Sequence, residues 1–299
     1  GAGRRTARGF TDTGGDAMQS EPSPYAAPSL IAEIDAEVVP PGAVALWWLG
    51  QASFVLKARD VIIYIDPYLQ RSAHRLSPPP FPPDAVTHAD LVLVTHDHID
   101  HVDPDALPGI AAASPRARFI APRPICARVA GLVGSTERVI PAVADEPLTL
   151  MVRGTPVEVR PVPARHEEFD LTDQGYPYLG YSVRVDGVCV HHSGDTIPYE
   201  GQIERVRAHG VDVALLPING RDFFRTRSGT IGNFDYREAA EFAVQIGAAV
   251  VVPMHYGMFR GNTVPPGYFV TYLHEFHPEQ AVHIMGRFGK YVHVGRRAT

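Results

Sequence analysis

The sequence reads Thr95-His96-Asp97-His98-Ile99-Asp100-His101 directly after the short apolar run 91–94. Side chains of a strand alternate with a period of two, so His96 and His98 leave this strand on the same side. The following turn brings Asp100 and His101 to a neighbouring position. Three histidines and an aspartate at these offsets arise by chance in about two per thousand chains of this histidine content. Because neutral imidazole and carboxylate suit zinc, manganese or iron, the spacing predicts a divalent-metal site.

Three more polar residues follow later apolar runs in the same way. His166 comes after residues 157–162, Asp195 after 188–192, and His255 after 250–253. Taken singly, each would be interpreted as an ordinary core, surface or turn residue. Loops at strand ends hold functional groups on a rigid frame, so in company with the first motif these residues are expected to complete one metal site.

The wider pattern predicts a domain of alternating strands and helices. Short apolar runs typical of strands occupy residues 44–49, 54–57, 61–65, 91–94, 119–121, 148–152, 157–162, 179–185, 188–192, 211–216 and 250–253. Helices are expected near residues 30–34, 104–113, 124–132, 202–209, 236–246 and 269–276. Each half of the chain has strands first and helix–strand units after, which predicts an α/β sandwich of two mixed β-sheets face to face, with helices outside.

The first residues differ in composition from the rest of the chain. Residues 1–27 are rich in Gly, Ala, Ser, Thr and Pro and carry few large apolar groups, which predicts a flexible N-terminal tail. Residues 28–299 are then expected to form a single domain.

Composition excludes several classes of protein. The chain has 299 residues and a formal charge of −6, with no long basic run, which argues against a nucleic-acid partner. No window approaches the roughly 20 apolar residues of a spanning helix, so no membrane partner is expected. The two cysteines, Cys126 and Cys189, form no CxxC and offer neither a disulfide framework nor a thiolate zinc site. A reducing, cytoplasmic location is therefore expected.

The order HxHxDH, His, Asp, His resembles the metallo-β-lactamase superfamily over about residues 43–286. Within it, three stretches look like the branch of L-ascorbate-6-phosphate lactonases: Trp47-Trp48-Leu49-Gly50-Gln51-Ala52-Ser53-Phe54, Asp66-Pro67-Tyr68 and Pro217-Ile218-Asn219-Gly220-Arg221-Asp222. The resemblance implies the four-layer αββα metallo-β-lactamase fold. It also implies one ion on His96, His98 and His166, a second on Asp100, His101 and His255, and Asp195 between them.

The resemblance further implies hydrolysis and one or two divalent ions. The lactonase branch holds a single manganese, whereas this sequence retains ligands for two; zinc, manganese and iron all suit the set. In a redox branch of the superfamily a glutamate stands at the position of His98, so the histidine here favours hydrolysis. The chain is shorter than those lactonases, which leaves the substrate open. A homo-oligomer is expected from the resemblance alone.

Five residues are candidates for supporting the metal or binding substrate. Asp66 ends a strand before Pro67, so it either forms a turn or accepts a hydrogen bond that orients a metal-bound imidazole. Asn219, Arg221 and Arg225 lie in a Gly-containing loop, where guanidinium groups either bind an anion or pair with a nearby acid such as Asp222. Tyr256 either hydrogen-bonds an oxyanion or packs.

These residues favour a metal-dependent hydrolase that opens a small lactone or related ester, including phosphorylated ones. Asp100 is expected to orient the attacking water and accept its proton, and Arg221 or Asn219 to anchor an anionic end of the substrate. One alternative is a phosphodiesterase of the same superfamily. Another is a non-catalytic, metal-stabilised protein that binds a metabolite.

Overall fold

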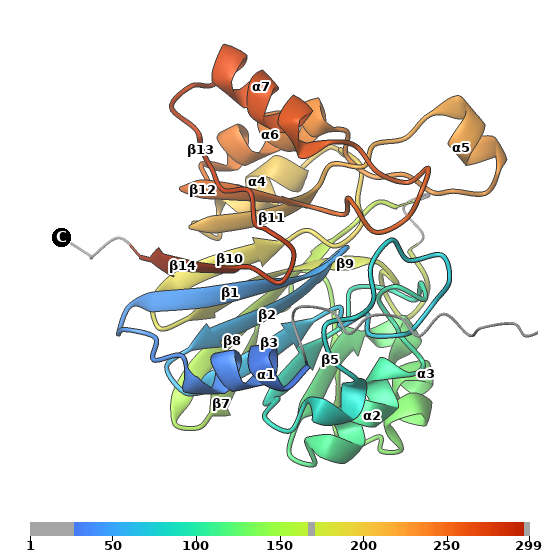
Figure 1. Ribbon diagram of the computed structural model, residues 1–299, viewed down its shortest axis with the longest axis vertical. Coiled ribbons are helices and arrows are strands. Elements are labelled where there is room, and N and C mark those ends of the chain that lie inside the picture. Colours follow the sequence, from blue (N-terminus) through green and yellow to red (C-terminus); the bar gives the residue numbers. More distant parts are fainter. Residues whose placement is uncertain (1–26, 167–170, 296–299) are drawn as a thin grey trace, which may run out of the picture.

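Two seven-stranded sheets form the centre of this protein, described by a computed structural model over residues 27–166 and 171–295 (Figure 1). The first has the order β14-β1-β2-β3-β4-β5-β6. Its strands are β1 (Ala43–Gly50), β2 (Ser53–Ala58), β3 (Val61–Ile65), β4 (Leu91–Leu93), β5 (Arg118–Pro122), β6 (Val139–Ala142) and β14 (Lys290–Val294). The second has the order β13-β12-β11-β10-β9-β8-β7. Its strands are β7 (Leu148–Val152), β8 (Thr155–Pro163), β9 (Leu179–Val185), β10 (Val188–His192), β11 (Val213–Pro217), β12 (Val250–Met254) and β13 (Ala281–Val282).

Both sheets change from antiparallel to parallel pairing along their width. In the first sheet β1, β2 and β3 pair antiparallel, while β3, β4, β5 and β6 pair parallel. In the second, β7 to β10 pair antiparallel and β10 to β13 pair parallel. Parallel neighbours end at the same edge of a sheet, so loops after β4, β10 and β12 can gather functional side chains there.

Strand β1 shows how the layers are packed, because both of its faces are buried. One set of alternate side chains belongs to the core shared with the second sheet: Val44, Leu46 and Trp48. The other set belongs to a core shared with α2: Ala45, Trp47 and Leu49. A strand covered on both faces reads as a continuous apolar run, as this one does.

Helices cover the outer faces of the two sheets (Figure 1). The helices on the side of the first sheet are α1 (Ala27–Ala36), α2 (Ala106–Ala113) and α3 (Cys126–Val133). Those on the side of the second are α4 (Gln202–Arg207), α6 (Tyr236–Ile246) and α7 (Pro266–Phe276). The short helix α5 (Phe223–Arg227) stands apart from the sheets on a projecting loop. The predicted sandwich is therefore confirmed.

A few local expectations differ from the structure. The strand β6 and the helix α5 were not expected, and β11 begins two residues later than the apolar run at 211 suggests. The predicted tail lies outside the described residues except for Ala27, which begins α1. Over the ranges that are described, every helix is too short or too polar to cross a membrane.

Candidate metal centre

The predicted ligand residues all follow strand ends at one edge of the sandwich. The His96–His101 motif comes after β4, and His166, Asp195 and His255 come after β8, β10 and β12. Gly194 permits the turn before Asp195, since its φ is +62° and a Cβ there would lie 2.6 Å from the carbonyl oxygen of Leu179. The backbone at His255 is also left-handed, with φ +62°, which is uncommon for a residue other than glycine.

These seven side chains converge. Three groups each offer ligand atoms within 4.8 Å of one another: His96, His98 and His166; His96, His101 and Asp195; and Asp100, His101 and His255. Asp195 is central, because its Oδ2 lies 3.1 Å from Nε2 of His255 and 3.6 Å from Nε2 of both His101 and His166. The structure thus brings together residues separated by up to 159 positions, from 96 to 255.

The donor set fits a divalent ion. Three buried atoms of these residues have no hydrogen-bond partner within the described ranges: Nε2 of His101, Nδ1 of His166 and Oδ1 of Asp195. A buried polar atom without a partner is costly, and an ion would relieve that cost for the atoms facing it. Imidazole and carboxylate donors of this kind suit zinc, manganese or iron.

Two of the histidines are in the form that binds metal. Burial, with a contribution from the His101 ring, holds the pKa of His96 well below its usual range. Burial lowers the pKa of His166 to about 4. Both imidazoles are therefore neutral at pH 7 and have a lone pair available.

Charge is balanced around Asp195. Burial opposes the charged forms of His101 and His255, but nearby carboxylates outweigh it: the pKa of His101 is raised mainly by Asp66, and that of His255 by Asp195. In return, His255 and His101 hold the pKa of Asp195 well below its usual range despite its burial. In the metal-free protein these protons supply positive charge that a bound ion would replace.

Asp66 supports the site from behind. Its Oδ2 lies 2.7 Å from Nδ1 of His101, and its carboxylate also accepts hydrogen bonds from the backbone N–H and the hydroxyl of Thr95. The other ring nitrogen of His101 faces the cluster, so Asp66 fixes the ring's orientation. Of the two roles considered for Asp66, the structure shows the supporting hydrogen bond, combined with a turn at φ +45°.

A pocket of about 270 Å³ opens onto the cluster. Five of the predicted ligands line it: His98, Asp100, His166, Asp195 and His255. Its other walls are Ile99, from the motif itself, and two loops that the sequence did not single out: the segment Gly229, Thr230 and Ile231, and Asn262. A water and a small substrate can therefore approach the ligand atoms from this side.

The predicted substrate residues lie around this pocket but not in its lining. Arg221 makes two hydrogen bonds of 2.6 Å to Glu238. Arg225 pairs with Asp222 and donates to the carbonyl of Asn219. Each loop arginine thus pairs with an acid, as one of the two alternatives predicted. The partner of Arg221 is Glu238, and Asp222 pairs with Arg225.

The other two predicted substrate residues are buried behind the pocket. The amide of Asn219 donates to Oδ1 of Asn262, which does line it. The ring of Tyr256 lies 4.8 Å from that of Trp48, and its hydroxyl has no hydrogen-bond partner within the described ranges. Burial raises the pKa of Tyr256 to about 12, so the hydroxyl keeps its proton.

Sequence reasoning missed the contact between Gln51 and the centre. The Gln51 amide nitrogen donates to Oδ2 of Asp100 and lies 3.0 Å from Nε2 of His255. The only feature of the sequence that pointed to Gln51 was its place after Gly50, in the stretch from Trp47 to Phe54 that resembles the lactonase branch. Nothing local indicates that a β1–β2 turn reaches residues 100 and 255.

Comparison with known proteins agrees with this architecture. The family model described as the beta-lactamase superfamily domain matches residues 62–256. A UPF0173 metal-dependent hydrolase of Pyrococcus furiosus is 31% identical over 75% of this chain and 87% of its own length. One from Thermococcus kodakarensis is 33% identical over the same shares. Among solved structures, Igni18, a metallo hydrolase from Ignicoccus hospitalis, is 25% identical with a TM-score of 0.65, covering 84% of this chain and 98% of that one.

Proposed function

This chain belongs to the metallo-β-lactamase superfamily as a metal-dependent hydrolase, and from that premise we propose that it opens a small lactone or a related ester. The observation that carries the proposal is the convergence of seven His and Asp side chains beside an open pocket, where three buried atoms of these residues have no hydrogen-bond partner among the described residues. A site closed by about four ligands would suffice for a structural ion, whereas this one is larger and open.

The residues for the ion follow from the triads. His96, His98 and His166 would hold one ion, Asp100, His101 and His255 a second position, and Asp195 lies between them. When bound, such an ion acts as a Lewis acid on the carbonyl and lowers the pKa of water from about 15.7 towards about 7.

The chain's own residues supply the proton transfer and the positioning. Asp100 is the partly exposed carboxylate of the pocket, so it orients the attacking water and takes its proton. Thr230 and Asn262 face the same space and can hydrogen-bond the polar end of the substrate. Arg225 donates to Oδ1 of Asn262 at 3.4 Å, and since Asp222 already pairs with its guanidinium, its role is to hold Asn262 in place.

Replacing Asp100 separates chemistry from binding. Asp100→Asn is expected to lower the turnover number by about 10²–10⁴-fold, the usual contribution of a general base. The histidine and Asp195 donors remain, so most of the metal should stay bound, as measured by elemental analysis of the purified variant. Full activity in this variant would remove Asp100 from the mechanism.

Phosphodiester cleavage is a second candidate because the donors suffice for two ions, which can clamp a phosphate. The test is a panel of lactones and bis-p-nitrophenyl phosphate, assayed after manganese or zinc is restored to metal-free protein. We expect hydrolysis of lactones. Cleavage of the phosphodiester alone would favour the second candidate, and tight metal binding with no turnover of any ester would favour a non-catalytic metabolite-binding protein.

A further inference from the structure

Gln51 is a fully buried side chain that the mechanism above does not use. It lies in the turn between β1 and β2 with φ +52°, a left-handed conformation that is uncommon for glutamine. The backbone carbonyl oxygen of Gln51 accepts hydrogen bonds from Nε1 of Trp48 and from the backbone N–H of His255. These contacts fix the backbone so that the side chain enters the cluster.

The amide of Gln51 engages two ligand atoms of the second metal position. Its Nε2 lies 3.0 Å from Oδ2 of Asp100 and 3.0 Å from Nε2 of His255. A carboxylate only accepts hydrogen bonds, so the NH₂ end of the amide faces Asp100. The amide oxygen Oε1 is buried and has no hydrogen-bond partner in the described part of the chain.

The distances leave little room for both an ion and this NH₂ group. Oδ2 of Asp100 and Nε2 of His255 are 3.9 Å apart. An ion about 2.1 Å from each would lie within about 3 Å of the amide nitrogen. One N–H bond points at a lone pair of Asp100 that the ion needs, while the amide nitrogen lies against the His255 ring, 3.0 Å from Nε2 and 3.3 Å from Nδ1. The positive end of this NH₂ group repels a cation.

At the other position, within the described part of the chain, the hydrogen bond at the ligand atoms runs between two of the ligands themselves. Nε2 of His96 lies 3.0 Å from Nδ1 of His98, and His166 completes that triad. Two of its metal-binding side chains, His96 and His98, are therefore in direct contact. Burial keeps His96 and His166 neutral.

We propose that Gln51 makes the two metal positions unequal. Its amide donates to Oδ2 of Asp100 and places an NH₂ group against His255, and so weakens the position formed by Asp100, His101 and His255. The position formed by His96, His98 and His166 is then the tight one. Gln51 also keeps the Asp100 carboxylate in place as the proton acceptor of the mechanism. This inference rests on the metal centre of the proposed function and not on the lactone as substrate.

The test is manganese binding by the full-length, metal-free protein. Equilibrium dialysis with elemental analysis gives the two dissociation constants, and the electron paramagnetic resonance spectrum distinguishes isolated from coupled Mn²⁺. Wild type should bind one equivalent tightly and a second more weakly. In Gln51→Leu the second ion should bind about tenfold tighter or more, since the hydrogen bond to Asp100 and the NH₂ group against His255 are removed.

A second variant at the same position tests the inference by a different chemical change. Gln51→Glu retains the length of the side chain and adds a carboxylate to the weaker position, so it should strengthen the second ion further and give the coupled spectrum at lower manganese. The matched control is Gln202→Leu, which changes a buried glutamine whose amide donates to Thr196. This control should bind manganese as wild type does.

Three results would overturn the inference. They are equal affinities for two ions in wild type, an unchanged second constant in both Gln51 variants, and loss of the second ion in Gln51→Leu, which would make Gln51 a ligand. Lactone hydrolysis with any of these would leave the proposed function standing. Manganese binding as expected without turnover of any ester would leave the inference standing and remove the proposed function.

Discussion

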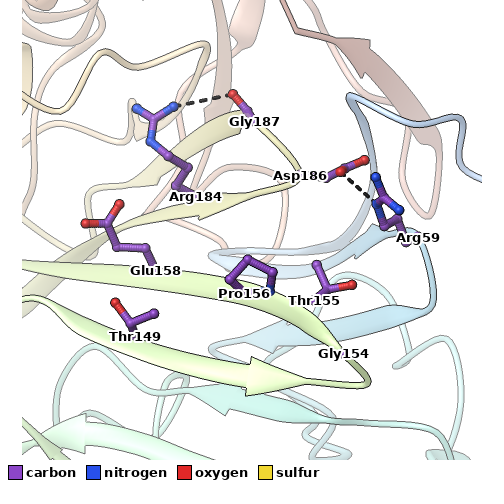
Figure 2. Close-up of a pocket in the computed structure, with 9 residues that line it drawn as sticks. All are labelled: Arg59, Thr149, Gly154, Thr155, Pro156, Glu158, Arg184, Asp186 and Gly187. Carbon is purple, nitrogen blue, oxygen red and sulfur yellow. Dashed lines mark hydrogen bonds and ion pairs between the residues drawn. The ribbon is translucent and has the colours of Figure 1, made fainter.

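The two ends of the strands carry polar clusters with different surroundings. At the end where β4, β8, β10 and β12 finish, the candidate metal centre faces a pocket of about 270 Å³. At the opposite end, the turns β2–β3, β7–β8 and β9–β10 line a larger pocket of about 580 Å³ (Figure 2). There Arg59 forms an ion pair with Asp186, and Arg184 donates to the carbonyl of Gly187.

The two ends differ in their buried polar atoms, and within the described residues atoms without hydrogen-bond partners lie beside the smaller pocket and not in the lining of the larger one. In the larger pocket Glu158 also pairs with Arg160, so its charged groups are already compensated. At the smaller one, Asp195 and His166 in the lining and His101 beside it keep buried atoms without partners among the described residues. Such atoms cost stability unless a ligand satisfies them, which is typical of a binding site.

The largest expected difference between the two ends comes from removing one carboxylate at each. Asp195→Ala removes the group shared by His101, His166 and His255, so hydrolysis should fall by at least about a thousandfold as the ion is lost. Asp186→Ala is the matched change at the opposite end and should keep wild-type turnover. Steady-state kinetics on both variants is the measurement, and equal losses would abolish the distinction.

A smaller effect is expected behind the metal centre. Asp66→Asn places an amide opposite three donors, two from Thr95 and one from His101, so the His101 ring loses its orientation. Metal affinity should fall about 10–100-fold, measured by competition with a chelator. The control is Asp186→Asn, which should leave the affinity unchanged; an equally unchanged Asp66→Asn would show that His101 needs no support.

His191, a buried histidine on β10, predicts how the free energy of unfolding changes with pH. Burial lowers the pKa of His191 to about 3, so the folded state stays unprotonated there while the unfolded state takes up a proton below about pH 6.5. The free energy of unfolding therefore falls as pH drops from about 6.5 to 3, by about 1.4 kcal/mol per pH unit for this one group.

The variant His191→Gln removes this pH dependence, because glutamine takes up no proton. Its free energy of unfolding, from urea titrations at several pH values, should fall less steeply with acid than that of wild type. His74→Gln, at an exposed position, is the control and should follow the wild-type curve. Parallel curves for wild type and His191→Gln would contradict this account of the buried imidazole.

The smallest effect is expected at the opposite end itself. Arg59→Ala breaks an ion pair in which the arginine side chain is 51% exposed, so unfolding should become easier by less than about 1 kcal/mol. Turnover and metal content should not change. A marked loss of activity would show that the larger pocket takes part in function.

The positions of the candidate ligands, which the structure brings together, could be found in the sequence because each is marked by its immediate neighbours. A polar residue directly after an apolar run can be recognised from neighbouring letters, as with His166, Asp195 and His255. The sandwich follows for the same reason, from strand-length apolar runs that alternate with helical segments. By contrast, β6 is short, half-exposed and contains Pro141, and its apolar signal is correspondingly weak.

Contacts between distant loops could not be predicted. Arg221 finds its acid in Glu238, 17 residues away, and Gln51 meets His255 across 204 residues. The pocket residue Asn262 lies in a loop with no apolar pattern to place it. Such contacts depend on how the turns pack in three dimensions, which the spacing of residues along the chain does not specify.

The central claim is that these strand-end loops hold a divalent ion beside the open pocket. Anomalous diffraction from crystals of protein purified without chelator tests it directly, with data collected on both sides of the metal absorption edge. The account predicts an anomalous peak among His96, His98, His166 and Asp195. Fully loaded protein whose only peaks lie elsewhere, or that shows none, would contradict it.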